Sequence, residues 1–243
     1  MIINFAKFKS SDEQKQTRFE FFPQMLNLLN TDADFFDNII WTDESYFNTA
    51  SAPNPKNTHF WSSQNPHLTV EIMRSGRVTL NVWCGIVRNK IIGPIFFEGA
   101  LNGQRYNQLP NSQIDEIITK FPLNVARNFV WQHDGAPGHS VLPVREFLNQ
   151  NYQTWIGRGG VIAWPANSPD LTPLDTFLWG YLKNKVSLVR PTNIDDMKVV
   201  IQNEIDFINN DRPDFIAHAI RNLKKRYRLC VEMNGGHIEH LLK

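Results

Sequence analysis

Cysteine is scarce in this sequence of 243 residues, which contains only Cys84 and Cys230. The two thiols lie far apart and form no CxxC motif, which argues against a disulfide framework and against a zinc site built from cysteines. His237 and His240 follow Cys230, but their spacing is also poor for zinc. We therefore expect this protein to work in a reducing compartment.

Long hydrophobic runs are missing too. The first residues, MIINFAKFKSSDEQKQ, contain no apolar stretch that could serve as a signal peptide. No segment approaches the roughly 18 consecutive apolar residues that are needed to cross a bilayer. These two absences predict an intracellular, soluble protein that does not enter a membrane.

Charge of one sign is not in excess, because 25 lysine and arginine residues balance 24 acidic residues to a net charge of +1. Any surface for nucleic acid must therefore be a local basic patch. Hydrophobic residues make up 42% of the chain, which is typical of a globular protein and argues against a disordered or fibrous one. The length fits one large domain, with or without a small appendage.

Hydrophobic spacing and turn residues divide the chain into expected strands and helices. Strands are predicted at 37–41, 78–87, 90–99, 129–134 and 161–164. Helices are predicted at 19–29, 104–121, 140–150, 174–186, 194–209 and 213–229. An antiparallel hairpin followed by alternating strands and helices predicts an α/β fold with a mixed five-stranded sheet flanked by helices, the pattern of a ribonuclease-H-like core.

Three aspartates occupy equivalent places in this layout. Asp43 is expected to end the first strand (WTDESYF), Asp134 ends a later strand (WQHDGAPGH) and Asp175 opens a helix (SPDLTPLD). Strand ends and a helix start on one rim of a sheet can bring such carboxylates together. Carboxylates suit magnesium, and two ions can stabilise both oxygens of an in-line phosphoryl displacement. Taken one at a time, an aspartate in such a place is usually a turn former or a helix cap.

These three blocks resemble the catalytic blocks of mariner-type transposases, in particular those of insect mariner-like elements. The likeness runs from about residue 19 to the C-terminal NGGHIEHLL and includes HFWSSQNPH, NVWCGI, IGPIFFEGAL and WIGRGG. The resemblance implies that Asp43, Asp134 and Asp175 are catalytic and hold two Mg²⁺ or Mn²⁺ ions, whereas Glu44 and Asp170 do not belong to the triad. It also implies DNA as the partner, as transposon ends and as target, together with a possible homodimer and a nuclear location.

The resemblance divides the chain into three expected parts. Residues 1–36 form a linker and a short helix, residues 37–190 form the ribonuclease-H-like catalytic core, and residues 191–243 add C-terminal helices that pack on the core. Members of the family carry helix-turn-helix modules at the N-terminus, and 36 residues are too few for two of them. Two hypotheses therefore stay open. The chain is a metal-dependent transposase domain, or it is a derived nucleic-acid-binding protein without catalytic activity.

Basic residues near the C-terminus are candidates for contact with DNA phosphates. Arginines and lysines gather in the last predicted helix, and Arg158 lies in the IGRGG loop. A solvated helix face is the ordinary meaning of such a cluster, but lysine and arginine supply most non-specific affinity for DNA. The predicted DNA-binding residues are Arg158, Arg221, Lys224, Lys225 and Arg228.

Two histidines lie beside the second acidic block. For His139 the sequence leaves two roles open, a place near the phosphate or a packing role at a helix start. His133 is expected on the opposite strand face from Asp134, which favours a structural role.

Overall fold

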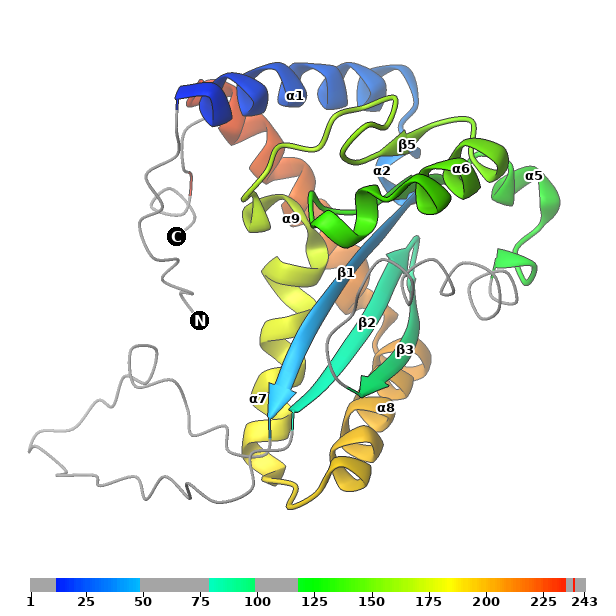
Figure 1. The fold of residues 1–243 in the computed structure, drawn as a ribbon, viewed down its shortest axis with the longest axis vertical. Coiled ribbons are helices and arrows are strands. Elements are labelled where there is room, and N and C mark those ends of the chain that lie inside the picture. Colours follow the sequence, from blue (N-terminus) through cyan, green and yellow to red (C-terminus); the bar gives the residue numbers. More distant parts are fainter. Residues whose placement is uncertain (1–11, 49–78, 99–117, 235–237, 239–243) are drawn as a thin grey trace, which may run out of the picture.

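A five-stranded mixed sheet forms the centre of the computed structural model, which describes residues 12–48, 79–98, 118–234 and 238 (Figure 1). The strands are β1 (Ile39–Asn48), β2 (Thr79–Val87), β3 (Lys90–Glu98), β4 (Val130–Gln132) and β5 (Trp155–Ile156). Their order across the sheet is β3-β2-β1-β4-β5, with an antiparallel half from β3 to β1 and a parallel half from β1 to β5. This topology confirms the predicted ribonuclease-H-like fold class.

Helices join and flank these strands. The α-helices are α1 (Asp12–Thr31), α2 (Phe35–Asn38), α5 (Leu123–Ala126), α6 (Leu142–Asn151), α7 (Trp179–Val189), α8 (Ile194–Asp211) and α9 (Pro213–Glu232). Two short 3₁₀ turns, η2 (Pro137–Ser140) and η3 (Pro169–Leu171), precede α6 and α7, and a π-turn, η4 (Leu174–Leu178), leads directly into α7. Within the described segments, no helix is both long enough and apolar enough to cross a membrane.

Both faces of the sheet carry a hydrophobic core, because successive side chains of a strand point to opposite faces. On β2, Val82 and Cys84 belong to one core, whereas Trp83 and Val87 belong to the other. The first core includes buried residues of α1, α7, α8 and α9, and the second includes buried residues of α6. Burial on both faces explains why β2 is almost continuously hydrophobic in sequence.

Two strand predictions are wrong in their position. The first strand does not end near Asp43 but continues to Asn48, because its antiparallel pairing with β2 extends as far as Asn48 and Thr79. The predicted strand at 161–164 is absent, and the edge strand is β5 instead. Ile162 makes only an isolated bridge to Ile156, where the chain folds back after a glycine-rich turn.

The helix predictions agree better with the structure. The predicted helices at 140–150, 174–186, 194–209 and 213–229 are confirmed as α6, η4 with α7, α8 and α9. Most of the helix predicted at 104–121 lies outside the described residues. The first helix is longer than predicted, since α1 already begins at Asp12, and it packs against α9. The predicted division into three parts stays a prediction.

Candidate active site

The three predicted aspartates line one pocket, but they do not meet closely enough to hold one ion. Trp41 pairs with Gln132, so Asp43 and Asp134 hold equivalent positions two residues further along the two chains. Asp175 enters from η4, which contacts β1. All three side chains line one pocket of about 320 Å³. Asp43 thus lies within a strand, whereas Asp134 follows one and Asp175 lies in a helical turn.

The segment that leads into η4 closes the other side of this pocket. Among the remaining residues that line it are Thr42, Gln132, Trp164, Ser168 and Thr172. A π-turn widens one helical turn by a residue, and such turns frequently occur at functional sites. Here the backbone N–H of Trp179 donates to the carbonyl of Leu174, which closes that wide turn around Asp175.

Asp43 is held in place by a tryptophan on the same helix as Asp175. Asp175, Trp179 and Lys183 follow one another at intervals of four residues, and Trp179 donates from Nε1 to Oδ2 of Asp43 at 2.7 Å. Burial and repulsion by Asp175 and Glu44 raise the pKa of Asp43 well above its usual range, although the hydrogen bond from Trp179 opposes that rise.

Asp175 is also perturbed by its surroundings. Burial and repulsion by Asp134 raise the pKa of Asp175 to about 7, although attraction to Lys183 opposes the change. Two of the three carboxylates are therefore harder to ionise than usual, because negative charge accumulates in one partly buried space. A bound cation would relieve this repulsion.

Asp134 is balanced by His139, whose role the sequence left open. His139 lies 2.7 Å from Oδ1 of Asp134 through Nδ1 and 3.2 Å from Oε2 of Glu44 through Nε2. Burial lowers the pKa of His139, but its hydrogen bonds to Asp134 and Glu44 outweigh burial and raise the pKa to about 10. Burial likewise raises the pKa of Asp134, yet the hydrogen bond with His139 brings it below the usual value. His139 is therefore a cation that bridges two carboxylates.

His133 lies behind this bridge in the core. It is fully buried, its ring stacks on that of His139 with centroids 5.1 Å apart, and it meets Trp155 edge-on. Burial and the positive charge of His139 lower the pKa of His133 to about 3, so this ring stays neutral. The position on the opposite strand face and the burial agree with the predicted structural role.

A buried ion pair fastens the pocket wall to α1. Arg18 binds Asp170 through two hydrogen bonds of 2.9 and 2.6 Å, and it also donates to Oγ of Ser168 at 2.7 Å. Arg18 and Asp170 are only 3% and 4% exposed. Arg18 is not among the residues that the sequence singles out. The available signal was its spacing, because Arg18 shares the buried helical stripe of Phe21 and Phe22, and a charge on such a stripe requires a partner.

Known proteins are similar to this chain in fold and in sequence. No protein-family model matches the chain. Human histone-lysine N-methyltransferase SETMAR is 25% identical across 94% of this chain, and the Tc1 transposase of Caenorhabditis elegans is 25% identical across 81% of it. The catalytic domain of Mos1 mariner transposase matches 96% of this chain and 99% of its own length, with a TM-score of 0.71 and 20% identity. The chain is a homologue of the mariner/Tc1 transposase catalytic domain.

The mariner/Tc1 relatives are longer than this chain. It spans 32% of the length of SETMAR and 68% of that of Tc1 transposase. A Mos1 paired-end complex with the left transposon end matches 98% of this chain and 67% of the Mos1 chain, with a TM-score of 0.77 and 19% identity. Mos1 paired-end complexes have also been solved with Mn and with Mg.

The carboxylate oxygens that line the acidic pocket suit a divalent cation, since Mg²⁺ and Mn²⁺ prefer carboxylates. The repulsion that raises two of the pKa values supports the same fit. Within the described residues, however, no three acidic, histidine or cysteine side chains meet closely enough to hold one ion as they stand. Asp43 is turned to Trp179 and Asp134 to His139, so the close convergence that the sequence predicts is not present.

None of the predicted DNA-binding residues lines the acidic pocket. Arg158 is exposed in the turn after β5. Arg221 and Lys225 line a separate cavity beside α9, whereas the exposed Arg228 is not among the residues that line it. Lys224 forms an ion pair with Asp37 at 3.1 Å. The basic cluster of the sequence is therefore split over different faces of one helix.

Proposed function

We propose that this chain is a metal-dependent DNA transposase domain, which hydrolyses a phosphodiester bond and then joins the freed 3′-hydroxyl to another DNA. The observation that carries the proposal is the acidic pocket. Asp43, Asp134 and Asp175 come from three different elements and line one cavity, where they repel one another. A structural role would not require three carboxylates in one partly buried place, because their mutual repulsion destabilises the fold.

Asp43, Asp134 and Asp175 are the proposed ligands of two Mg²⁺ or Mn²⁺ ions. When bound, such ions activate the attacking oxygen and stabilise the leaving oxygen of an in-line displacement. The Mos1 complexes solved with Mn and with Mg support this choice of ions.

Neighbouring side chains orient the proposed ligands. Trp179 holds one oxygen of Asp43, and His139 holds one oxygen of Asp134. Each contact leaves the second carboxylate oxygen for other partners. Groups that orient ligands in this way commonly affect metal affinity or activity by about 10- to 100-fold. The same His139 also forms an ion pair with Glu44, so a side chain of the protein balances the charge of the Glu44 carboxylate.

The proposed substrates are transposon ends and target DNA, bound by a homodimer in the nucleus. The Mos1 complex with a transposon end supports the choice of DNA. A nucleic-acid-binding protein without activity is the second candidate. It is favoured by one observation, namely that no three of the possible ligand side chains among the described residues converge on one point.

Nicking of a supercoiled plasmid with Mn²⁺ or Mg²⁺ separates these candidates. We expect metal-dependent nicking by the wild type and its loss in Asp134→Asn, which keeps the size of the side chain and an oxygen for His139. Asp206→Asn makes the same chemical change at an exposed site on α8 and should nick like the wild type. Equal nicking by the wild type and Asp134→Asn would show that the pocket is not the catalytic site.

Thermal unfolding gives a readout that does not depend on activity. A ligand at a hundredfold excess over its dissociation constant stabilises the folded state by about 2.7 kcal/mol. We expect Mn²⁺ to stabilise the wild type in this way and to have much less effect on Asp43→Ala. The same metal-induced shift in both proteins would exclude Asp43 as a ligand, and stabilisation without nicking would favour the second candidate.

A further inference from the structure

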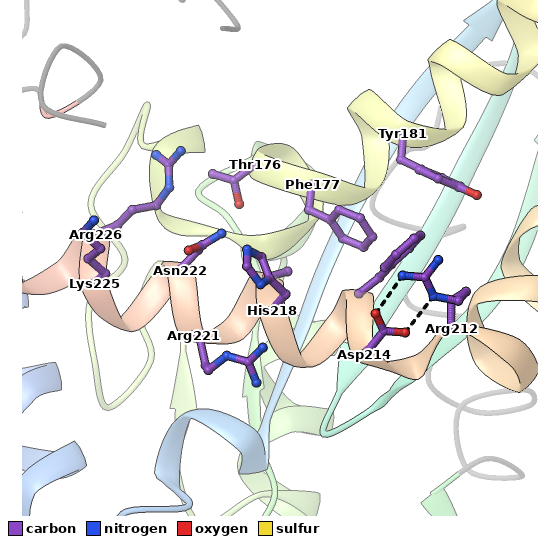
Figure 2. Close-up of a pocket in the computed structure, with 12 residues that line it drawn as sticks. Thr176, Phe177, Tyr181, Arg212, Asp214, His218, Arg221, Asn222, Lys225 and Arg226 are labelled. Atoms are coloured by element: carbon purple, nitrogen blue, oxygen red, sulfur yellow. Dashed lines mark hydrogen bonds and ion pairs between the residues drawn. The ribbon is translucent and has the colours of Figure 1, made fainter. Parts of the chain in front are cut away.

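A second, larger cavity lies between η4 with α7 on one side and α9 on the other (Figure 2). We call it the α7–α9 groove, and its volume is about 760 Å³. The residues that line it are Thr176, Phe177, Tyr181, Arg212, Asp214, Phe215, His218, Ala219, Arg221, Asn222, Lys225 and Arg226. None of them lines the acidic pocket, so this is a separate site.

Positive charge dominates the α9 side of the groove. Among the described residues, four cationic side chains and a single carboxylate line it, and that carboxylate, Asp214, is already bound by Arg212 through two hydrogen bonds of 2.9 Å. His218, Arg221 and Lys225 lie three and four residues apart, which puts them on one face of α9. Neither Arg221 nor Lys225 has an acidic partner within the described part of the chain. The groove therefore suits a ligand that carries several negative charges.

Aromatic rings form the other part of the groove. Phe177 and Tyr181 come from η4 and α7 (Figure 2). Phe215 comes from α9. The ring centroid of Phe215 lies 6.3 Å from that of Phe177 and 6.1 Å from that of Tyr181, and the rings are only partly buried. The guanidinium of Arg212 lies 3.9 Å from the centroid of Phe215. Planar groups are thus available beside the cations.

We propose that the α7–α9 groove binds single-stranded DNA, with phosphates against Arg221 and Lys225 and bases against the rings of Phe177 and Phe215. A basic groove with aromatic side chains is the usual means of holding a single strand. The bases of a duplex are stacked inside it and cannot reach such rings. An acidic peptide would satisfy the cations but would leave the rings without a partner of matching shape.

The choice of DNA rests on the proposed function, and the position of the groove supports it. Asp175 lines the acidic pocket, and the next two residues, Thr176 and Phe177, line the groove. The π-turn η4 is therefore a wall that the two sites share. A strand that leaves the acidic pocket over η4 would enter the groove directly.

Fluorescence anisotropy with a labelled oligothymidylate of about 12 nucleotides tests the proposal. The measurement is made on the full chain in EDTA, so it does not depend on catalysis or on the metal site. We expect the double variant Arg221→Ala, Lys225→Ala to bind at least about tenfold more weakly. Its slope of log affinity against log salt should also fall by about 1.4, because each phosphate contact on a single strand contributes about 0.7.

The matched control removes the same charge outside the groove, at residues that are not among the predicted DNA-binding residues. The double variant Arg127→Ala, Lys198→Ala should bind oligothymidylate within about twofold of the wild type, because neither residue lines the groove. Equal weakening by the two double variants would overturn the proposal, since the binding would then depend on net charge alone. Absence of oligothymidylate binding by the wild type at low salt would overturn it as well.

The aromatic part of the groove is tested with Phe215→Leu, which removes the ring and keeps an apolar side chain. We expect binding about five- to tenfold weaker, in line with the loss of a stacked base. Thermal unfolding confirms that the variant is folded, and Phe177→Leu provides a second test from the other wall. Duplex DNA of the same length or polyglutamate that competes as well as unlabelled oligothymidylate would assign the groove to a duplex or to an acidic peptide instead.

Discussion

The acidic pocket and the α7–α9 groove lie on two sides of the same π-turn, and they differ in the sign of their charge and in its exposure to water. In the pocket, three aspartates share a partly buried space, and two of them have raised pKa values. In the groove, Arg212, Arg221 and Lys225 are exposed, and Asp214, the one carboxylate among its described lining residues, is paired with Arg212. The pocket accumulates charge of one sign where water is limited, whereas the groove presents charge where water is plentiful.

This difference shows how each surface can be used. Repulsion among buried carboxylates costs stability but creates a strong local field, which a metal ion can satisfy. Exposed cations cost little stability and attract phosphates over a distance that salt shortens. We therefore expect changes in the pocket to affect chemistry and folding, and changes in the groove to affect mainly binding.

The largest effect is expected for Asp175→Asn. Nicking should fall by about a thousandfold or more, as is common when a residue at the chemical centre is lost. Binding of oligothymidylate in EDTA should stay within about twofold of wild type, because Asp175 faces the pocket and not the groove. A folded Asp175→Asn protein that nicks at the wild-type rate would refute the assignment of Asp175 as a metal ligand. Asparagine can replace aspartate as a helix cap, so such a result would leave only a capping role for Asp175.

The difference in stability between Asp175→Asn and the wild type should also depend on pH. The pKa of Asp175 is raised to about 7 in the fold from an ordinary value of 3.8. Its stabilising contribution is therefore complete below pH 3.8 and is lost as the pH rises through 7. In EDTA, Asp175→Asn should become more stable relative to the wild type between pH 4 and pH 8, which thermal unfolding would measure.

The second effect concerns two ion pairs, one beside each site. Arg18→Met leaves Asp170 buried without its partner and should lower the free energy of unfolding by about 3–5 kcal/mol. The exposed pair of Arg212 and Asp214 provides the comparison, and Arg212→Met should have a much smaller effect. Urea unfolding measures both. If the two variants were equally stable, the Arg18–Asp170 pair would not hold the pocket wall.

The last effect, expected for His139→Gln, is a dependence of stability on pH. The pKa of His139 is raised to about 10 in the fold from 6.5, so its contribution is complete below pH 6.5 and is lost as the pH rises through 10. The stability advantage of the wild type over His139→Gln should therefore shrink between these values, by at most about 1.4 kcal/mol per pH unit. An advantage that stays constant across this range would mean that His139 is not charged in the fold.

Most of the secondary structure follows from local patterns. The hairpin of β2 and β3, the helices α6 to α9 and the fold class can be predicted because alternation and helical spacing are properties of a few neighbouring residues. Dependence on local patterns also explains why the prediction of a strand at 161–164 is wrong. VIAW is apolar because Ile162 and Trp164 are buried, yet these residues are buried in a turn that folds back on β5. Hydrophobic content alone cannot distinguish a buried strand from a buried turn.

The sequence by itself singled out the three aspartates as a group and predicted the elements in or beside which they lie. Only the tertiary structure decided what surrounds them. The register of β1 against β4 aligns Asp43 with Asp134, and Arg18 meets Asp170 across 152 residues of sequence. Likewise, the packing of α9 against its neighbours divides one run of basic residues between a groove and an ion pair with Asp37. Such contacts depend on how distant elements pack, whereas periodicity records only which face of an element is buried.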